Sequence, residues 1–342
     1  MKLFAFLTLV VNPTRMNKTK IFVQNYNISK ESRLPVLLIV FNRPEETGKV
    51  LQALKQSGVR KLYIHGDGPR SSSESDLADI TQVWNEVSRI DWECEVHTER
   101  SDKNLGCGNG VFSAVSWFFQ HEERGIILED DVLPSTGLFL TLEKMLFGLE
   151  ENGEVGAVSG FNWTPRSHIS DNGASFHYTN YAQSLAWGTW KRAWEGFSLD
   201  PQVWQSGLNY KKLHKLGGSR FARYWLNFYQ EEIISGKLDT WDVQWGAYNW
   251  SHGRKFAVTN NNFALHIGFN ERATHTRADN IPDWHPEYMA IQPDELVIPN
   301  CPIDKKADRW ANSNFYPINL VSSLRVRLRS RVWSKIPWSL HN

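Results

Sequence analysis

Three consecutive carboxylates, Glu129, Asp130 and Asp131, follow a short run of branched aliphatic residues, Ile126 to Leu128. Such a run is typical of a strand buried on both faces, and its carboxyl end is where open α/β sheets bind their ligands. Adjacent carboxylates repel each other unless a cation neutralises them, and oxygen ligands suit Mg²⁺ or Mn²⁺. The three acids therefore predict a divalent cation that holds a phosphorylated ligand.

A helix cap is the simpler explanation of Asp131. Pro134 and Ser135 follow it, and the apolar pattern from Leu138 to Leu149 indicates a helix that an Asp or Ser could cap. Because one acid is enough for a cap and the chain has three, we favour the metal over the cap.

The elements that must position these acids alternate in type from Leu34 to about Gly160. Apolar runs predict strands, and segments with one apolar face predict helices between them. Strands separated by helices of this length form βαβ units with a mostly parallel sheet. We expect strands at residues 34–41, 61–65, 93–97 and 125–128, and helices after Pro44, over 77–87 and over 111–119.

Polar side chains also follow the first two predicted strands. Arg43 could bind a phosphate with its planar guanidinium, and Asp67 could accept hydrogen bonds from a base or ribose. The glycine-rich stretch Asn104 to Gly110 precedes a helix and is similar to a phosphate-binding turn. It lacks the Lys-Ser/Thr of a P-loop and does not follow a strand in G-x-G-x-x-G form, which argues against a dinucleotide dehydrogenase.

The second half of the chain is rich in tryptophan. Eight of the sixteen tryptophans fall between Trp187 and Trp250. Most tryptophans pack in cores, but so dense a cluster also suits a groove where sugar faces stack on rings. At least one of Trp187, Trp190 and Trp245 is therefore a candidate for acceptor binding.

The order of these motifs resembles that of the GT-A glycosyltransferases, most of all the N-acetylglucosaminyltransferase I family and its bacterial relatives. That family has, in order, a strand ending in Asp-Arg, a Gln-Asp-Gly turn, a Glu-Asp-Asp metal motif and a Trp-Asp-Asp-Trp segment. The resemblance covers roughly residues 34 to 280. The segments that carry it are Pro35–Arg43, His65–Gly68, Ile126–Val132, Val158–Asn162, Trp187–Trp194 and Trp241–Trp245.

The resemblance implies an α/β protein of the GT-A, Rossmann-like class, with a mostly parallel sheet flanked by helices and an aromatic-rich acceptor-side half. It implies that Asp131 coordinates Mn²⁺ (or Mg²⁺) on the donor diphosphate, and that Asp130 and Glu129 contact the ribose and the transferred sugar. Asp67 would meet the base and Arg43 the phosphates.

Two further roles follow from the resemblance. The stretch Asn270 to Thr276 is similar to a loop that closes over the donor, so Arg272 could contact the diphosphate and His275 the metal; a lone histidine is more often an ordinary residue.

Inversion needs a base for the acceptor hydroxyl, and Asp242 matches the family position of that carboxylate. The family's second acid is Val243 here, so Asp242 serves alone or yields to Asp239. A first-turn helix acid is the alternative for Asp242.

Composition narrows the class of protein. With 342 residues, 41% apolar and 22% charged, the chain is an ordinary globular protein. Its formal charge is +1, but residues 320–342 hold five cations and no acid, so by charge the rest does not bind nucleic acid. Cys94, Cys107 and Cys301 have neither disulfide nor zinc spacing, which favours a reducing compartment.

We divide the chain into an N-terminal extension (1–33), a nucleotide-sugar-binding half (34–162), an acceptor-binding and catalytic half (163–319) and a basic tail (320–342). The apolar run Leu3 to Val11 is too short to span a bilayer, and Met16 could be the true first residue. The tail either is solvated or lies on an anionic membrane.

The sequence thus predicts a metal-dependent, inverting glycosyltransferase of the cytoplasm or the inner face of the membrane, in envelope polysaccharide synthesis. It would move a sugar from a nucleotide-sugar, by resemblance a UDP-sugar, to a glycan or glycolipid. A nucleotidylyltransferase is disfavoured because its G-x-G-T-R opening is absent after the first strand. A non-catalytic carbohydrate-binding or adhesin-like protein is the alternative from another class.

Overall fold

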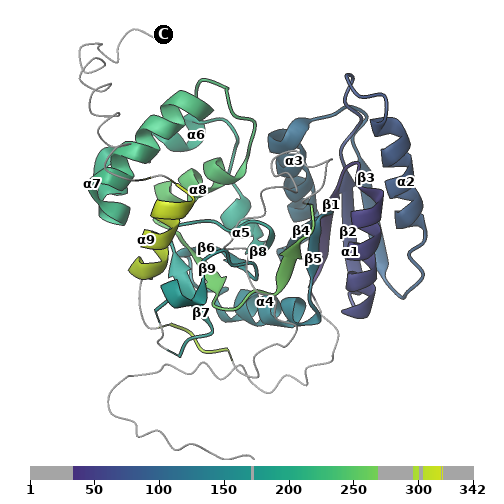
Figure 1. Cartoon of the computed structure of the whole chain (residues 1–342), viewed down its shortest axis with the longest axis horizontal. Coiled ribbons are helices and arrows are strands. Elements are labelled where there is room, and N and C mark those ends of the chain that lie inside the picture. Colours follow the sequence, from purple (N-terminus) through teal and green to yellow (C-terminus); the bar gives the residue numbers. More distant parts are fainter. Residues whose placement is uncertain (1–33, 171–172, 269–295, 300–302, 317, 319–342) are drawn as a thin grey trace, which may run out of the picture.

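The computed structural model of the chain describes residues 34–170, 173–268, 296–299, 303–316 and 318. Its centre is an eight-stranded mixed sheet of order β3-β2-β1-β4-β8-β6-β9-β7 (Figure 1). β8 and β7 run antiparallel to their neighbours, and the other pairs are parallel. The strands are Val36–Val40 (β1), Lys61–Gly66 (β2), Glu95–Arg100 (β3), Arg124–Glu129 (β4), Val155–Ser159 (β6), Phe176–Thr179 (β7), Ala186–Trp190 (β8) and Lys255–Thr259 (β9).

Helices cover both faces of this sheet. They are α1 (Pro44–Gln56), α2 (Asp76–Ser88), α3 (Gly106–His121), α4 (Thr136–Gly148), α5 (Lys191–Trp194), α6 (Gln202–Gln205), α7 (Tyr210–Phe228), α8 (Asp242–Ser251) and α9 (Lys305–Asn314). A 3-10 turn (η1, Arg166–His168) and a π-helical turn (η2, Tyr229–Ile233) complete the helical elements of the described residues.

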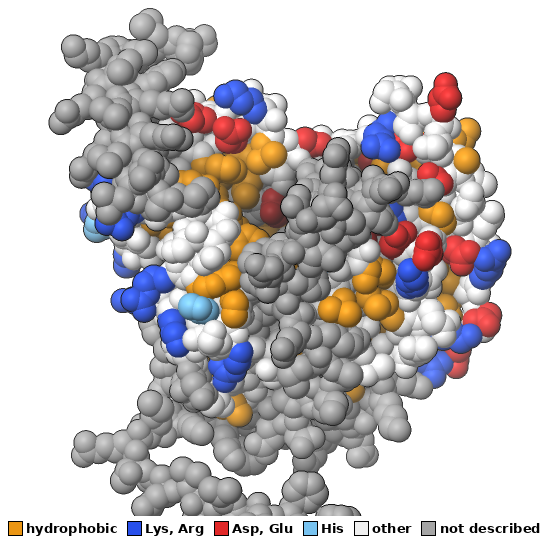
Figure 2. Space-filling view, viewed as in Figure 1, with side chains coloured by type: hydrophobic (Ala, Val, Ile, Leu, Met, Phe, Trp, Pro, Cys, Tyr) orange, Lys and Arg blue, Asp and Glu red, His pale blue; other side chains and the backbone are white. Residues whose placement is uncertain are grey.

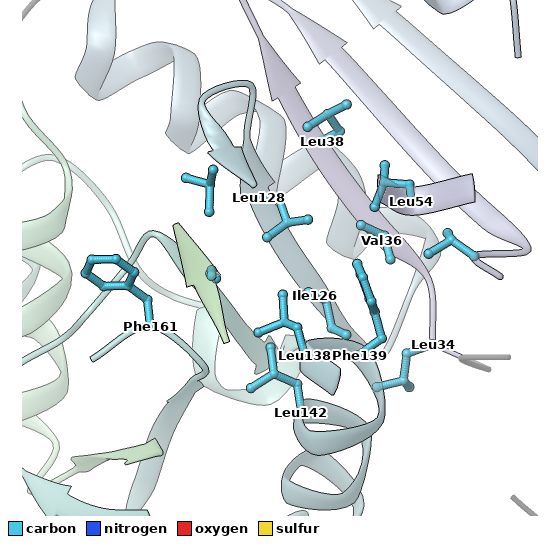
Figure 3. Close-up of a cluster of buried hydrophobic side chains, with 14 of the residues drawn as sticks. Leu34, Val36, Leu38, Leu54, Ile126, Leu128, Leu138, Phe139, Leu142 and Phe161 are labelled. Carbon is cyan, nitrogen blue, oxygen red and sulfur yellow. The ribbon is translucent and has the colours of Figure 1, made fainter. Parts of the chain in front are cut away.

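Successive side chains of a strand point to opposite faces, so each central strand contributes to two cores. On one face, Val36 and Leu38 of β1 and Ile126 and Leu128 of β4 pack with α1, α2 and α4. Figure 3 shows these four residues against α4 and the adjoining loops. On the other face, Leu37 and Ile127 pack with α3, α7 and α8 in a cluster dominated by aromatic rings.

The predicted fold class is confirmed: a large, mostly parallel sheet is flanked by helices in a Rossmann-like α/β arrangement. Each predicted strand and helix of the first half exists, with ends shifted by a few residues. The largest shift is at α3, which begins at Gly106 and not at Val111. Glycines lower helix propensity, so the pattern indicated the helix only from its first apolar residue. Strands from both sides of residue 162 join the one sheet.

The cap interpretation of Asp131 is wrong. A short strand, β5 (Val132–Pro134), separates Asp131 from α4, and the residue before that helix is Ser135. β5 pairs antiparallel with β10 (Ala264–His266), which returns from the far half of the chain. This two-stranded ribbon therefore stands directly beside the acids.

One edge of the molecule is basic. Figure 2 shows lysine and arginine side chains along the edge where α7 and α9 lie. The exposed cations of these two helices are Lys211, Lys215, Arg220, Lys305, Lys306 and Arg309. No helix in the described part of the chain has the length and apolar character needed to cross a membrane.

Candidate active site

The acids lie where β4 and β1 end side by side. Glu129 is the last residue of β4 and pairs in register with Ile39 of β1. The loops that follow these two strands therefore start next to each other. Asp130 and Asp131 are almost fully buried there, with 2% and 4% of their surface exposed. Buried carboxylates require partners, because removal from water disfavours the charged form.

Arg43 is the main partner of both aspartates. Its Nη1 lies 2.9 Å from Oδ1 of Asp130 and also 2.9 Å from Oδ2 of Asp131. The backbone N–H of Phe41 donates to Oδ2 of Asp130 at 2.9 Å. The loop after β1 therefore supplies both a cation and an amide donor to the turn after β4, as expected for neighbouring parallel strands.

The ribbon of β5 and β10 holds Asp131 from the other side. Val132 pairs with His266, and the N–H of Ile267 donates to the backbone carbonyl of Asp131 at 2.8 Å. Nε2 of His266 lies 3.4 Å from Oδ2 of Asp131. A Cβ atom on Gly268 would lie only 2.3 Å from this oxygen, so the close approach requires glycine. Sequence reasoning missed His266, which stands 135 positions from Asp131 with no local motif around it.

Burial and the charges of neighbouring groups give the three acids different pKa values. Burial and the charges of Asp131 and Asp130 raise the pKa of Glu129 to about 8. Burial also raises the pKa of Asp130 to about 6, although Arg43 opposes the rise. For Asp131, burial acts in the same direction, but His266 and Arg43 hold its pKa below the ordinary value. At neutral pH, Asp131 is thus the acid most fully ionised.

These residues fit a divalent cation in part. Oδ1 of Asp131 is buried and has no hydrogen-bond partner among the described residues, so an oxygen lone pair is left for a ligand. The part of the chain that the structure describes contains no group of three or more His, Cys, Asp or Glu side chains that could hold a metal. A cation on Asp131 would therefore need further oxygens from a bound molecule, and Mg²⁺ and Mn²⁺ typically take them from phosphates.

A buried brace fixes the loop that carries Arg43. Asp76, the first residue of α2, is fully buried and accepts from Nδ2 of Asn42 at 3.0 Å and from Nε of Arg70 at 2.8 Å. The bonds from Arg70 hold the pKa of Asp76 well below its usual range. The Arg70 guanidinium also lies 5.3 Å from the centre of the Phe41 ring. Phe41 and Asn42, the two residues before Arg43, are thus held by Arg70 and by the start of α2.

Two carboxylates occupy the amino end of α3. Asp67 accepts from the N–H groups of Gly68, Leu105 and Gly106 and from Nδ2 of Asn104, at 2.8–3.2 Å. Asp239 accepts from the N–H of Cys107 at 3.1 Å and of Gly108 at 3.0 Å. The glycine-rich stretch is thus an anion-binding helix start that protein acids fill. Both oxygens of Asp67 already accept hydrogen bonds from the protein. The predicted contact of Asp67 with a base stays a prediction.

Asp242 is the first residue of α8, and its side chain accepts from the Thr240 hydroxyl. It lines a small cavity with aromatic residues that the sequence did not single out: Tyr181, Trp225, Tyr229, Trp250 and Tyr316. The Tyr229 hydroxyl donates at 2.9 Å to the carbonyl of Val243, which fixes the start of α8. Asp242 is thus both a first-turn helix acid and a carboxylate at a cavity.

The charge of Asp242 reaches the acids of β4. Desolvation is the main cause of the raised pKa of Glu129, and Asp242 adds to it. Burial and then the charges of Glu129, Asp242 and Asp239 raise the pKa of the Cys107 thiol to about 12. Glu129 and Asp242 are therefore close enough for their charges to act on each other and on Cys107, near the start of α3.

The three tryptophans predicted to stack on an acceptor are core residues. Trp187 and Trp190 are 2% exposed and Trp245 is fully buried. Trp187 stacks on Trp241 at 5.3 Å between ring centres, and Nε1 of Trp190 donates to the carbonyl of Leu146 at 3.1 Å. As placed, the rings offer no face to a sugar, so we do not carry their stacking role into the proposal below. Arg272 and His275 lie outside the described residues.

No protein-family model matches the chain, and no curated protein matches it. Solved structures that match include a UDP-glucose pyrophosphorylase complexed with UDP-glucose, 8% identical over 66% of this chain and 90% of that chain, with a TM-score of 0.30. The inositol-1-phosphate CTP transferase from T. maritima is 11% identical over 69% and 89%, with a TM-score of 0.34. HddC from Yersinia pseudotuberculosis is 9% identical over 46% and 78%, with a TM-score of 0.28. At such scores the likeness assigns no activity, and function has to be argued from the site itself.

Proposed function

We propose that the chain is a metal-dependent, inverting glycosyltransferase that moves a sugar from a nucleotide-sugar donor to a glycan or glycolipid acceptor. One observation carries the proposal: the Arg43 guanidinium and two buried carboxylates meet at the carboxyl ends of β1 and β4, and a further carboxylate, Asp242, is close enough to help raise the pKa of Glu129. A scaffold that only packs or only binds glycans has no need of this arrangement, since buried charges cost stability.

The donor diphosphate would lie at the acidic turn. Asp131, with its unbonded Oδ1, would hold Mn²⁺ or Mg²⁺ together with His266. When bound, the cation would neutralise charge that builds on the departing diphosphate. Arg43 would bind the phosphates, and Glu129 and Asp130 would contact the ribose and the transferred sugar. We propose UDP as the nucleotide on the resemblance of the motifs alone.

Asp242 would remove the proton from the acceptor hydroxyl. The contacts favour it over Asp239, because both oxygens of Asp239 already accept from backbone N–H groups of α3. Among the described residues, Asp242 accepts only from the Thr240 hydroxyl, and it lines a cavity.

We also propose that the enzyme works in the cytoplasm, at the inner face of the membrane. The exposed cations of α7 and α9 support contact with an anionic surface, and the basic residues 320–342 follow α9 in the sequence. The tail itself lies outside the described residues.

The test is release of nucleoside diphosphate from UDP-, GDP- and dTDP-sugars with Mn²⁺. We expect release from one donor, and a fall of about 10²–10⁴-fold in Asp131→Ala, because a Lewis acid at the leaving group contributes several kcal/mol. Glu151→Ala, which removes an exposed carboxylate, is the matched control. Parallel assays with sugar 1-phosphates and nucleoside triphosphates should release no pyrophosphate. If no donor turns over and none binds by calorimetry, the carbohydrate-binding alternative replaces this proposal.

A further inference from the structure

The position of Arg43 between two buried acids suggests a role beyond phosphate binding. A single nitrogen, Nη1, lies 2.9 Å from an oxygen of Asp130 and 2.9 Å from an oxygen of Asp131, where both carboxylates are nearly inaccessible to water. The Arg43 side chain is itself 15% exposed. The guanidinium thus stands in the place that a cation shared by the two acids would take.

We infer that Arg43 is the resident counter-ion of this acid pair and competes with the divalent cation for Asp131. The inference rests on the metal site of the proposed function. Binding of a cation at the free Oδ1 of Asp131 would put a second positive centre within a few ångströms of Nη1. Like charges at such distances in a buried site disfavour each other strongly.

The contacts indicate how Arg43 can yield. Asp130 accepts from Arg43 through Oδ1 and from the Phe41 N–H through Oδ2, so it keeps a donor when Arg43 moves. Asp131 keeps His266 at 3.4 Å. The guanidinium Nε has no partner among the described residues, and the brace of Asp76 holds Asn42 rather than the Arg43 side chain. Arg43 can therefore turn from Asp131 to a diphosphate while the backbone of its loop stays fixed.

Two consequences follow. Without nucleotide, the folded protein needs no metal to neutralise its acids, and its affinity for the cation is lowered by Arg43. With nucleotide, the diphosphate gives Arg43 a new anionic partner, so metal and nucleotide bind cooperatively. A residue that only positions the donor would not change metal binding in the absence of nucleotide.

The test is titration of the full chain with Mn²⁺ by electron paramagnetic resonance, first without nucleotide and then with UDP. We expect Arg43→Gln to bind Mn²⁺ about tenfold or more tightly than wild type without UDP, because one adjacent like charge is removed. UDP should strengthen Mn²⁺ binding in both proteins, because its phosphates supply oxygen ligands, but by a larger factor in wild type, where the diphosphate also draws Arg43 away from Asp131. Arg89→Gln, which removes an exposed arginine paired with Glu86, should behave as wild type.

Unchanged or weaker Mn²⁺ binding by Arg43→Gln would overturn the inference. So would tight binding that persists in Arg43→Gln/Asp131→Asn, because the ion would then lie elsewhere. Should Arg43→Gln fail to fold without metal, Mn²⁺ during refolding should restore its native circular dichroism, and failure to restore it also counts against the inference. If no donor turns over but Arg43→Gln binds Mn²⁺ more tightly, glycosyl transfer is rejected and the counter-ion role of Arg43 stands. If a donor turns over and Arg43→Gln does not bind Mn²⁺ more tightly, glycosyl transfer stands and the counter-ion role is rejected.

Discussion

Two regions in the interior of this protein are opposite in chemistry. The acidic edge, formed by Glu129, Asp130, Asp131 and Arg43, places charges out of water at the ends of β1 and β4. The aromatic core, on the α3–α7–α8 side of the sheet, places rings against rings; its tryptophans are Trp187, Trp194, Trp204, Trp225, Trp241, Trp245 and Trp250. Buried charges cost stability unless fully paired, whereas buried rings supply it. Burial alone therefore does not distinguish residues of the scaffold from residues of the site.

The sharpest test of this contrast is at Asp242, where the two regions meet. Asp242→Asn keeps the shape and the acceptor for Thr240 but removes the base, so turnover should fall by about 10²–10⁴-fold. The free energy of unfolding should change little, because the side chain is only partly buried. Steady-state turnover and urea unfolding of the same preparation would measure both.

Asp239→Asn is the matched control. This variant should be about 1 kcal/mol less stable, because the N–H groups at the start of α3 lose a charged acceptor. It should keep most of its turnover. The reverse result, a large loss of turnover in Asp239→Asn with an active Asp242→Asn, would move the base to Asp239.

The next test asks whether a candidate acceptor tryptophan belongs to the scaffold. Trp190→Ala removes a ring that is 2% exposed and the N–H that serves the carbonyl of Leu146. The free energy of unfolding should fall by about 3–5 kcal/mol, as for other buried aromatic residues. Chemical denaturation measures it, with Phe147→Ala, an aromatic that is 43% exposed, as a control expected to cost much less.

The acceptor KM decides the alternative for Trp190. Enzyme that remains folded at low temperature should bind acceptor with unchanged KM. A raised KM in a variant of normal stability would return Trp190 to the acceptor site and weaken the contrast between the two regions.

The sequence predicted the acidic edge well because its signal is local. An apolar run that ends in acids indicates both a strand and its ligand-binding end, and Arg43 follows from the same rule applied to the first strand. His266 and Asp76 could not be found in this way. They reach the edge through β10 and α2, and pairing over such distances depends on tertiary structure rather than on neighbouring residues.

The aromatic core was harder to interpret for the opposite reason. Tryptophan suits both a core and a sugar-binding surface, and the choice depends on which face of a strand or helix each ring occupies. In β8, Trp187 and Trp190 are three residues apart and belong to cores on opposite faces of the sheet. Period-two alternation would have separated the two rings, but it could not show that helices cover both faces.

The last test concerns the stability of the fold in acid, and it begins at β2. His65 on β2 is 1% exposed, and burial lowers its pKa to about 4. In the unfolded chain a histidine takes up its proton near pH 6.5, so between these values the unfolded state binds more protons. Stability therefore falls as pH drops through this window, by up to about 3 kcal/mol in total. Unfolding curves from pH 7 to 4 should be flatter for His65→Gln.

Asp308 on α9, bonded to Thr179 of β7 at the far edge of the sheet, provides the comparison. Burial raises its pKa to about 6, although Thr179 and Asn180 donate to it. Here the folded state binds more protons, so the contribution of Asp308 to stability falls as pH rises from about 4 to 6, the opposite sign to His65. Because the two groups oppose each other, the wild-type curve alone tests neither, and only the difference from each variant does. Parallel curves for wild type and His65→Gln would mean that a charged His65 is accommodated, with Glu99 at 3.6 Å as its partner.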